Sequence, residues 1–417
     1  MAQLSDDCFA FEGRLIPLAD AEERIADQYG CLAGAETVPL LEAMGRVLAD
    51  DVIAPIAVPP VANSAVDGYA VRFDDLDPSS ETALPVWGRA AAGHPLAAPL
   101  PPGHAAQVFT GAAMPEGADT VLMQEDCATA PGLVRLRPGI RRGANRRLAG
   151  EDIARDERAL AAGERLGAAE LALLAALGQT QIAVRRRLRV ALFSTGDEIA
   201  EPGTTLPRGR VYDANRFMLA ALLTRAGAVV SDGGILPDNP DQIGTALRAA
   251  APAHDLVLTS GGVSAGEEDH VRAAIENVGT LTFWRVAIKP GRPVALGTAL
   301  GTPLLGLPGN PVAALVTFLA IARPLLDRLA GAGHRPLPRF PATADFTHRK
   351  KNGRREYLRA TLHGDAAAPR ARLYPKEGAG IITSLTRSDV LLELSEAVTQ
   401  VEPGDPVLVI PMGLIDG

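Results

Sequence analysis

Residues 188–329 alternate short apolar runs with longer amphipathic segments, and this alternation limits the possible folds more than any other feature of the chain. Runs such as RVALFS and HDLVLTS predict buried strands. The segment DANRFMLAALLTRAGA predicts a helix that is capped by Asp213 and ends near Gly227. A β-α-β-α order of this kind predicts a doubly wound, mostly parallel sheet, whose ligands bind at the carboxyl ends of the strands.

The rest of the chain has a different texture. Residues 35–54 and 166–178 have helical periodicity, whereas short β-like runs between Pro/Gly turns fill residues 59–150 and return in the last ~80 residues. We therefore expect a multi-domain α/β protein. The expected parts are a helical linker domain (1–58 and 151–186), an inserted β-rich domain (59–150), the α/β sheet domain (187–334) and a small C-terminal β-barrel (335–417).

The composition excludes several classes of protein. A net charge of −8 argues against a general nucleic-acid binder, and the basic runs at 141–147, 185–189 and 348–355 are expected to be solvated. The three cysteines form no CxxC pair, which argues against a zinc site or a disulfide framework. No apolar run reaches the ~18 residues of a membrane span, and the acidic start lacks a basic-then-apolar leader, so we expect a cytoplasmic protein.

Glycine-rich loops follow three of the predicted strands. They are STGDEI (194–199), TSGGVSAGEED (259–269) and GLPGNPVAA (306–314). Each fits a unit of strand, glycine turn and helix, in which free N–H groups favour an anion. None fits the GxxxxGK[ST] or GxGxxG patterns of nucleotide-binding loops. Three such loops in one sheet predict a ligand that carries phosphate.

Acidic residues lie in or beside these loops. Asp197 and Glu198 are in the first loop, the run 267–269 closes the second, and Asp238 follows another predicted strand. Carboxylates beside a phosphate site usually hold Mg²⁺, which bridges both negative charges. The alternative is that each acid only caps a helix, for which Asp238 and Glu268 are well placed.

Two further polar stretches remain open on the residues alone. The turn AIKPGRP offers Lys289 and Arg292, which suit a small oxyanion or, alternatively, form a solvent-facing basic hairpin. The stretch PPVANSAVDGYAVR offers Asn63, Ser64 and Asp67, which could hydrogen-bond either a turn or a ligand.

Taken together, the motifs resemble those of one family. PPVANSAVDGYAVR, FTGAAMPEGADTVLMQED, GEDI, STGDEI, YDANRFML, TSGGVSAGEEDH, AIKPGRPVALG and GLPGNPVAA occur in the order found in the MoeA family, the molybdopterin molybdenumtransferases related to the gephyrin E domain. The resemblance implies a homodimer of four-domain subunits with a site shared between subunits. It also implies a Mg²⁺-dependent reaction in which adenylylated molybdopterin and molybdate give molybdenum cofactor and AMP. A molybdopterin adenylyltransferase is the expected substrate donor and partner.

The resemblance also assigns roles to individual positions. It places in the catalytic set Asp67, Thr110, Asp152, Glu198, Asp238 and Asp269. The metal ligands among these are Glu198, Asp238 and Asp269. The positions expected to bind the molybdopterin substrate are Ser194, Gly196, Ser260, Gly261, Gly262, Ser264, Pro308, Gly309 and Pro311. The molybdate side is assigned to Lys289, Arg292, Arg359 and Ser384.

Two departures from the family pattern and two other functions have to be considered. Val66 replaces the usual methionine and is expected to be silent, whereas Ala379 replaces a common serine and puts Ser384 and the last domain's contribution in question. A gephyrin-like scaffold without chemistry is one alternative, but the retained acids weigh against it. A molybdopterin adenylyltransferase is the other, and the extra domains and GGVS in place of a Gly-Gly-Thr-Gly loop weigh against that.

Overall fold

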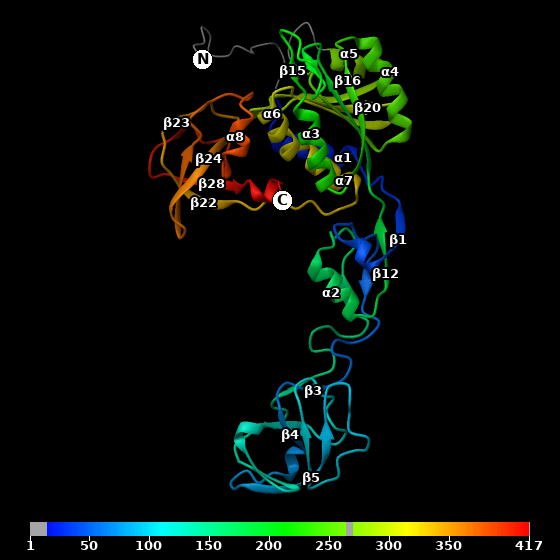
Figure 1. The fold of residues 1–417 in the computed structure, drawn as a ribbon, viewed down its shortest axis with the longest axis vertical. Helices are drawn as coiled ribbons and strands as arrows, with labels where there is room; N and C mark the ends of the chain where they lie inside the picture. The colour runs from blue at the N-terminus through cyan, green and yellow to red at the C-terminus, as the bar shows by residue number, and fades with distance from the viewer. Residues whose placement is uncertain (1–14, 264–269, 417) are drawn as a thin grey trace. The chain divides into compact units, whose positions relative to one another are not determined.

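The computed structural model describes residues 15–263 and 270–416, which divide into two compact units (Figure 1). The first unit comprises the described parts of Met1–Glu36, Gly45–Ala49 and Ala183–Gly417, and the second comprises Thr37–Met44 and Asp50–Ile182. The predicted boundaries of four domains stay a prediction. Ser264 and Asp269, two of the predicted site residues, lie outside the described residues.

A six-stranded sheet forms the centre of the first unit. Its order is β16-β13-β17-β21-β20-β18, in which the first four strands are parallel and the last two are antiparallel to their neighbours. The strands are β13 (Arg189–Thr195), β16 (Val229–Leu236), β17 (Leu256–Ser260), β18 (Gly279–Arg285), β20 (Pro293–Ala299) and β21 (Thr302–Leu307). This is the mostly parallel sheet that the alternating pattern predicts.

Helices cover both faces of this sheet (Figure 1). Along β13, Val190 and Leu192 pack into one core, whereas Ala191 and Phe193 pack into the other, as the two-residue period of a strand requires. The first core contains residues of α1 (Leu18–Gln28), α3 (Asn215–Arg225), α6 (Pro311–Thr317) and α7 (Arg323–Leu329). The second contains residues of α4 (Pro240–Ala250) and α5 (His270–Val278). A π-helical turn, Phe318–Ala322, joins α6 to α7.

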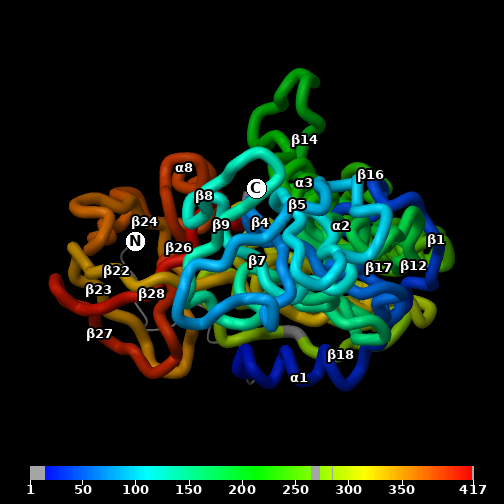
Figure 2. The backbone as a smooth tube through the Cα atoms, turned by 90° about the horizontal axis from the view of Figure 1, so that it is seen from below, coloured from blue at the N-terminus to red at the C-terminus, as the bar shows by residue number. Residues whose placement is uncertain are grey.

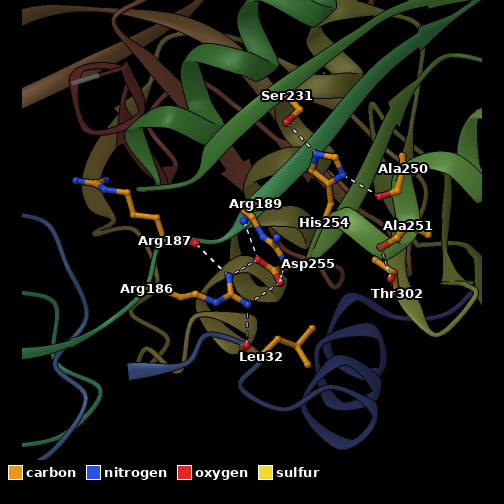
Figure 3. A network of polar contacts seen from close by, with 10 residues as sticks. All are labelled: Leu32, Arg186, Arg187, Arg189, Ser231, Ala250, Ala251, His254, Asp255 and Thr302. Atoms are coloured by element: carbon orange, nitrogen blue, oxygen red, sulfur yellow. Dashed lines mark hydrogen bonds and ion pairs between the residues drawn. The ribbon is translucent and has the colours of Figure 1, made fainter. Parts of the chain in front are cut away.

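A network of polar contacts ties the amino-terminal end of β17 to its surroundings (Figure 3). Asp255 accepts hydrogen bonds from the Arg186 guanidinium at 2.6 and 2.8 Å and from the backbone N–H of Arg189 at 2.8 Å. Arg186 also reaches the Leu32 carbonyl. The basic run 185–189 is therefore not the fully solvated face that its composition predicts.

The last part of the first unit is a closed barrel. Hydrogen bonds run in a ring through β24 (Arg355–Asp365), β25 (Ala368–Leu373), β22 (Phe340–Ala344), β28 (Pro406–Pro411) and β26 (Val390–Leu394), and β26 pairs back with β24. The short pair β23 (His348–Arg349) and β27 (Gln400–Val401) and the helices α8 (Thr383–Thr386) and α9 (Gly413–Asp416) complete it. In the basic run 348–355, Lys350 is buried and donates to the Arg354 carbonyl at 2.6 Å, so solvation does not account for all of this run.

The second unit is rich in strands. A six-stranded sheet has the order β7-β4-β6-β5-β9-β8, formed by β4 (Gly68–Val71), β5 (Thr82–Ala90), β6 (Ala105–Val108), β7 (Thr120–Met123), β8 (Cys127–Ala130) and β9 (Leu133–Leu136). The chain reaches this sheet through β2 (Val52–Ile53) and β3 (Asn63–Ser64). It returns through β10 (Arg146–Arg147) and β11 (Arg158–Leu160), which pair antiparallel with them, and then forms α2 (Ala168–Ala176). In sequence, the second unit thus lies between parts of the first, and the predicted insertion of residues 59–150 into a helical domain stays a prediction.

The helix predicted for residues 35–54 is wrong. The segment instead forms β1 (Ala35–Pro39), which pairs with β12 (Gln181–Arg185), followed by a single 3-10 turn at Leu40–Ala43. Pro39 disfavours helical backbone angles at the residue before it, Val38. Gly45 has a φ of +73°, so the chain departs from helical geometry on both sides of that turn. Leu41 is 88 % exposed, so the apolar spacing does not mark a buried face.

The unit of strand, glycine turn and helix predicted at STGDEI is interrupted. The chain first makes an excursion through β14 (Ile199–Ala200) and β15 (Val211–Tyr212), which pair in parallel and project as a loop (Figure 2). Prolines and glycines in EPGTTLPRG exclude a helix there. Helix α3 starts only at Asn215, and its cap position is Ala214 rather than Asp213, although the Asp213 carboxylate accepts the Arg216 N–H at 3.1 Å.

Among the described residues, no helix is long and apolar enough to cross a membrane.

Candidate functional site

The three glycine loops meet at one edge of the sheet because β13, β17 and β21 are adjacent and parallel. Ser194 is in register with Ser260, and Ser260 with Leu307, so the strands end at the same level. The N–H of Gly261 donates to the Leu307 carbonyl at 2.9 Å, which carries the ladder one residue into the loop. The carboxyl edge of this sheet is where the fold predicts a ligand.

Gly261 allows these loops to approach one another closely. Its φ is +99°, and a Cβ at this position would lie 2.3 Å from the Thr195 carbonyl oxygen. A Cβ on Gly309 would lie 3.6 Å from the Gly261 Cα, so the third loop lies against the second. The glycines predicted from the sequence therefore bring the backbones together, and a larger side chain at 261 would separate them.

Asn215, at the start of α3, joins two of the loops and was not assigned a role from the sequence. Its Nδ2 donates to Ser260 Oγ at 2.9 Å and to the Gly309 carbonyl at 2.8 Å. The sequence signal was its position at the start of the helix in YDANRFML. Its contacts cross 45 and 94 residues of chain, which no local pattern reveals.

Several buried polar atoms at this edge have no hydrogen-bond partner among the residues that the structure describes. They are Ser194 Oγ, Thr195 Oγ1, Thr259 Oγ1 and Asn215 Oδ1. A buried polar atom without a partner costs about 1–3 kcal/mol, so such atoms are rare unless a ligand or water completes them. Four of them at one strand edge indicate a binding site, and they supply both hydroxyl donors and an amide acceptor.

Two of the predicted acids lie beside the first loop. The carboxylate of Asp238 accepts the N–H of Asp197 at 3.1 Å, and the N–H of Asp238 donates to the Asp197 carboxylate at 3.2 Å. Helix α4 is capped by Asn239, not by Asp238, so the capping alternative does not account for Asp238. Glu198 is exposed, and its carboxylate lies over Gly196. Within 15–263 and 270–416, no group of three or more acidic, histidine or cysteine side chains is arranged to hold a metal.

The turn that carries Lys289 and Arg292 connects the sheet to the barrel. Strand β19 (Ile288–Lys289) pairs in parallel with β24, where Lys289 is opposite Glu356. The Lys289 ammonium lies 3.3 Å from Glu356 Oε2 and its side chain is 51 % exposed, so the oxyanion site and the solvent-facing hairpin both stay predictions. A Cβ on Gly291 would lie 2.6 Å from Thr317, which shows how closely the turn packs on α6.

Arg359 and Ser384 meet inside the barrel domain. Arg359 Nε donates to Ser384 Oγ at 3.1 Å, and its Nη2 donates to the Gly378 carbonyl at 3.0 Å. Burial lowers the pKa of Arg359, and the charge of Glu377 offsets this only in part. The Ser384 hydroxyl is fully buried and donates to the Ile381 carbonyl, so in this arrangement it holds Arg359.

Residue 379 contributes through its backbone. The Ala379 carbonyl accepts the N–H of Val312 at 2.9 Å, which fixes the 378–382 loop to the start of α6. The third glycine loop, the Lys289 turn and the Arg359 loop are thus brought to α6 from three parts of the first unit. The roles predicted for Lys289, Arg292, Arg359 and Ser384 stay predictions.

In the second unit, Asp67 and Thr110 form one constellation. The Thr110 N–H and hydroxyl both donate to Asp67 Oδ1 at 2.8 Å. These hydrogen bonds, the backbone one first, hold the pKa of the exposed Asp67 carboxyl below its usual range. Asp152 is exposed, and its N–H donates to the Val58 carbonyl at 3.0 Å; its place in the catalytic set stays a prediction.

Comparison with known proteins gives matches to three regions of the chain. Residues 16–178 match the MoeA N-terminal region (domains I and II), residues 191–328 match a probable molybdopterin binding domain, and residues 341–412 match the MoeA C-terminal region (domain IV). A molybdopterin molybdenumtransferase of Haemophilus influenzae is 36 % identical over 97 % of this chain and all of its own length. The chain belongs to the MoeA family.

Other relatives agree with this assignment. Molybdopterin molybdenumtransferase 2 of Mycobacterium tuberculosis is 37 % identical over 88 % of this chain and 93 % of its own. A crystal structure of the molybdopterin biosynthesis MoeA protein from Pyrococcus horikoshii superimposes with a TM-score of 0.77 at 32 % identity, over 96 % of this chain and 99 % of that one. The MoeA fold expected from the motifs is therefore confirmed.

Proposed function

We propose that this chain is a molybdopterin molybdenumtransferase that inserts molybdenum into molybdopterin. Its substrates would be adenylylated molybdopterin and molybdate, and its products molybdenum cofactor and AMP. Family membership supports the reaction class. The observation that carries the proposal is the carboxyl edge of the parallel sheet. Buried polar atoms without a partner among the described residues lie there beside three closely packed glycine loops, and this combination suits a polar, phosphate-bearing ligand.

Each of these residues would have a role that follows from its chemical type. Asn215 holds the second and third loops together and keeps its Oδ1 available at the strand edge. Lys289 and Arg359 supply positive charge for the molybdate oxyanion. Asp67, whose ionised form the Thr110 hydrogen bonds favour, would act as a catalytic carboxylate. Positioning and electrostatic complementarity are what phosphoanhydride chemistry asks of a protein.

We propose that the carboxylates beside the first loop bind a Mg²⁺ ion. Magnesium is usually held by one or two carboxylates together with substrate phosphates, and Glu198 and Asp238 are two carboxylates at the correct edge of the sheet. We propose that these residues, with Asp269, would hold Mg²⁺. The ion would neutralise charge on the phosphate oxygens of the bound substrate.

AMP release from adenylylated molybdopterin, with and without molybdate and in the presence of Mg²⁺, tests the function. Molybdate-dependent release is the expected result. Retention of the ligand without any release would contradict the proposal and favour a gephyrin-like scaffold. Transfer of AMP from ATP to molybdopterin would instead identify a molybdopterin adenylyltransferase. Omitting Mg²⁺ should abolish release, and full activity in a metal-chelating buffer would remove the proposed metal site.

Assembly, partners and location are further proposals. We propose a homodimer, which sedimentation of the purified chain would detect. We also propose that a molybdopterin adenylyltransferase hands over the substrate in the cytoplasm. A coupled assay with the adenylyltransferase and labelled molybdopterin tests the handover. If the labelled adenylylated molybdopterin passes directly between the proteins, an excess of unlabelled free adenylylated molybdopterin should not dilute the label in the product.

A further inference from the structure

Glu356 is a buried carboxylate that nothing in the motifs assigns. Its side chain has no solvent exposure. Its Oε2 accepts hydrogen bonds from the Lys289 ammonium at 3.3 Å and from His348 Nε2 at 3.0 Å. Its Oε1 is buried and has no hydrogen-bond partner among the described residues. Burial raises the pKa of Glu356, but the hydrogen bond from His348 and the charge of Lys289 outweigh it, so the pKa lies below its usual value and the group is ionised.

A stability role alone does not account for this arrangement. Burying an ion pair carries a large desolvation cost, and replacing the pair with apolar residues is often neutral or stabilising. The unpartnered Oε1 adds to that cost. The partner on the other side, Lys289, is 51 % exposed, so the pair does not seal a core. The carboxylate is instead placed beneath an ammonium that faces solvent.

Lysine needs such support if it is to hold an oxyanion. Its four-carbon stem is flexible, and fixing it in one conformation costs side-chain entropy. A buried, ionised carboxylate opposite it in register fixes the ammonium before any ligand arrives. The ammonium has three donors, so the contact with one carboxylate oxygen leaves donors for a ligand.

We propose that Glu356 is a positioning residue that pre-orders Lys289 for molybdate, with His348 donating to the same carboxylate oxygen. The proposal deepens the molybdenumtransferase function and rests on it. Glu356 would not touch molybdate itself. Glu356 would therefore affect only the binding of molybdate, and only by positioning Lys289.

The barrel supplies a matched control. Glu393, on β26, is also a buried carboxylate in an ion pair, but its partners are Arg339 and Arg355. Glu356→Gln and Glu393→Gln each remove one buried negative charge from the same small domain. A general loss of barrel stability would affect both variants, whereas positioning of Lys289 would affect only the first.

The experiment measures molybdate-dependent AMP release in the full-length chain, with molybdate titrated calorimetrically onto the same preparations. We expect E356Q to raise the molybdate KM about tenfold, with kcat and the KM for adenylylated molybdopterin changed less than threefold. E393Q should leave the molybdate KM unchanged. Glu356→Asp keeps the negative charge on a shorter side chain, and we expect its molybdate KM to lie between those of wild type and E356Q. The same variant tests the proposal if E356Q does not fold. In a Lys289→Met background, E356Q should add no further change.

The outcomes separate the two proposals. Equal molybdate KM in E356Q and wild type, or an equal rise in E393Q, would overturn the role of Glu356 alone. A further rise caused by E356Q in the Lys289→Met background would do the same, because the effect would then not pass through Lys289. A wild-type chain that neither binds molybdate nor releases AMP would overturn the molybdenumtransferase function, and this inference with it.

Discussion

The two ends of β17 differ in whether their buried polar groups have hydrogen-bond partners. At the amino-terminal end, Asp255 is saturated by Arg186 and by the Arg189 N–H, and its side chain is only 7 % exposed. At the carboxyl-terminal end, Thr259 and the neighbouring Ser194 have buried hydroxyls without a partner among the described residues. Among the described residues, the Asp255 carboxylate at one end thus has its hydrogen-bond partners, whereas the Thr259 and Ser194 hydroxyls at the other end have none.

This difference separates stability from function. A complete network lowers the free energy of the folded chain and gains nothing from a ligand. An incomplete network raises that free energy, and a ligand that supplies the missing partners recovers it as binding energy. Substitutions at the two edges should therefore move stability and affinity in different combinations.

The largest expected effect on stability is at Asp255. Asp255→Ala leaves Arg186 without its buried counter-charge and should lower the free energy of unfolding by about 3 kcal/mol or more. Burial raises the pKa of Asp255, but its hydrogen bonds from Arg186 and Arg189 outweigh this and hold the pKa below its usual value. The carboxylate therefore stabilises the fold above its unfolded pKa, and this contribution is lost as the pH falls through the folded pKa.

Urea unfolding at neutral and acid pH checks this prediction. The difference in stability between wild type and D255A should be large at neutral pH and shrink in acid. The KM values of the folded variant should equal those of wild type. A changed KM would show that the amino-terminal edge also contributes to the site, and the contrast between the edges would fail.

The second effect is on the approach of the loops. Gly261→Ala puts a Cβ 2.3 Å from the Thr195 carbonyl at a φ of +99°, so the second loop must move away from the first. We expect turnover to fall on the order of 10²-fold, because displacements of about 1 Å have such effects. Gly333→Ala is the control, since a Cβ there meets nothing within 4 Å. Equal turnover in the two variants would mean that the close approach has no role in binding.

The parts of this site that the sequence predicts are those with a local signature. The buried strands and the glycine loops after them follow from patterns within about ten residues. Asn215 and Glu356 could not be predicted in this way, because their partners lie far along the chain. The excursion after Gly196 was missed because strand-to-helix order is a rule for regular units, and β14 and β15 interrupt this one.

The third effect has opposite signs for stability and affinity. Ser194→Ala removes a buried hydroxyl that has no partner among the described residues, so unfolding should become up to about 1 kcal/mol less favourable. Affinity for adenylylated molybdopterin should fall about tenfold, because the ligand loses a hydrogen bond. Thr120→Val is the contrasting control: its buried hydroxyl accepts the Gly143 N–H, so stability should fall and affinity should not change. Loss of stability in S194A would show that the hydroxyl has a partner in the unliganded chain.

The smallest expected effect is on Asp67 in the second unit. This carboxylate is exposed, but it accepts two hydrogen bonds from Thr110. Thr110→Val removes the hydroxyl donor and keeps the backbone N–H, which is the stronger cause of the low pKa of Asp67. The pKa of Asp67 should therefore rise but stay below its usual value. If the ionised carboxylate is needed for turnover, the acid limb of the pH–rate profile should move to higher pH, with a loss of no more than about threefold at neutral pH. Asp67→Asn is the limiting case and should lower turnover on the order of 10²-fold at every pH. An acid limb that does not move in T110V, together with wild-type turnover in D67N, would place Asp67 outside the chemistry and leave the Thr110 contact a structural one.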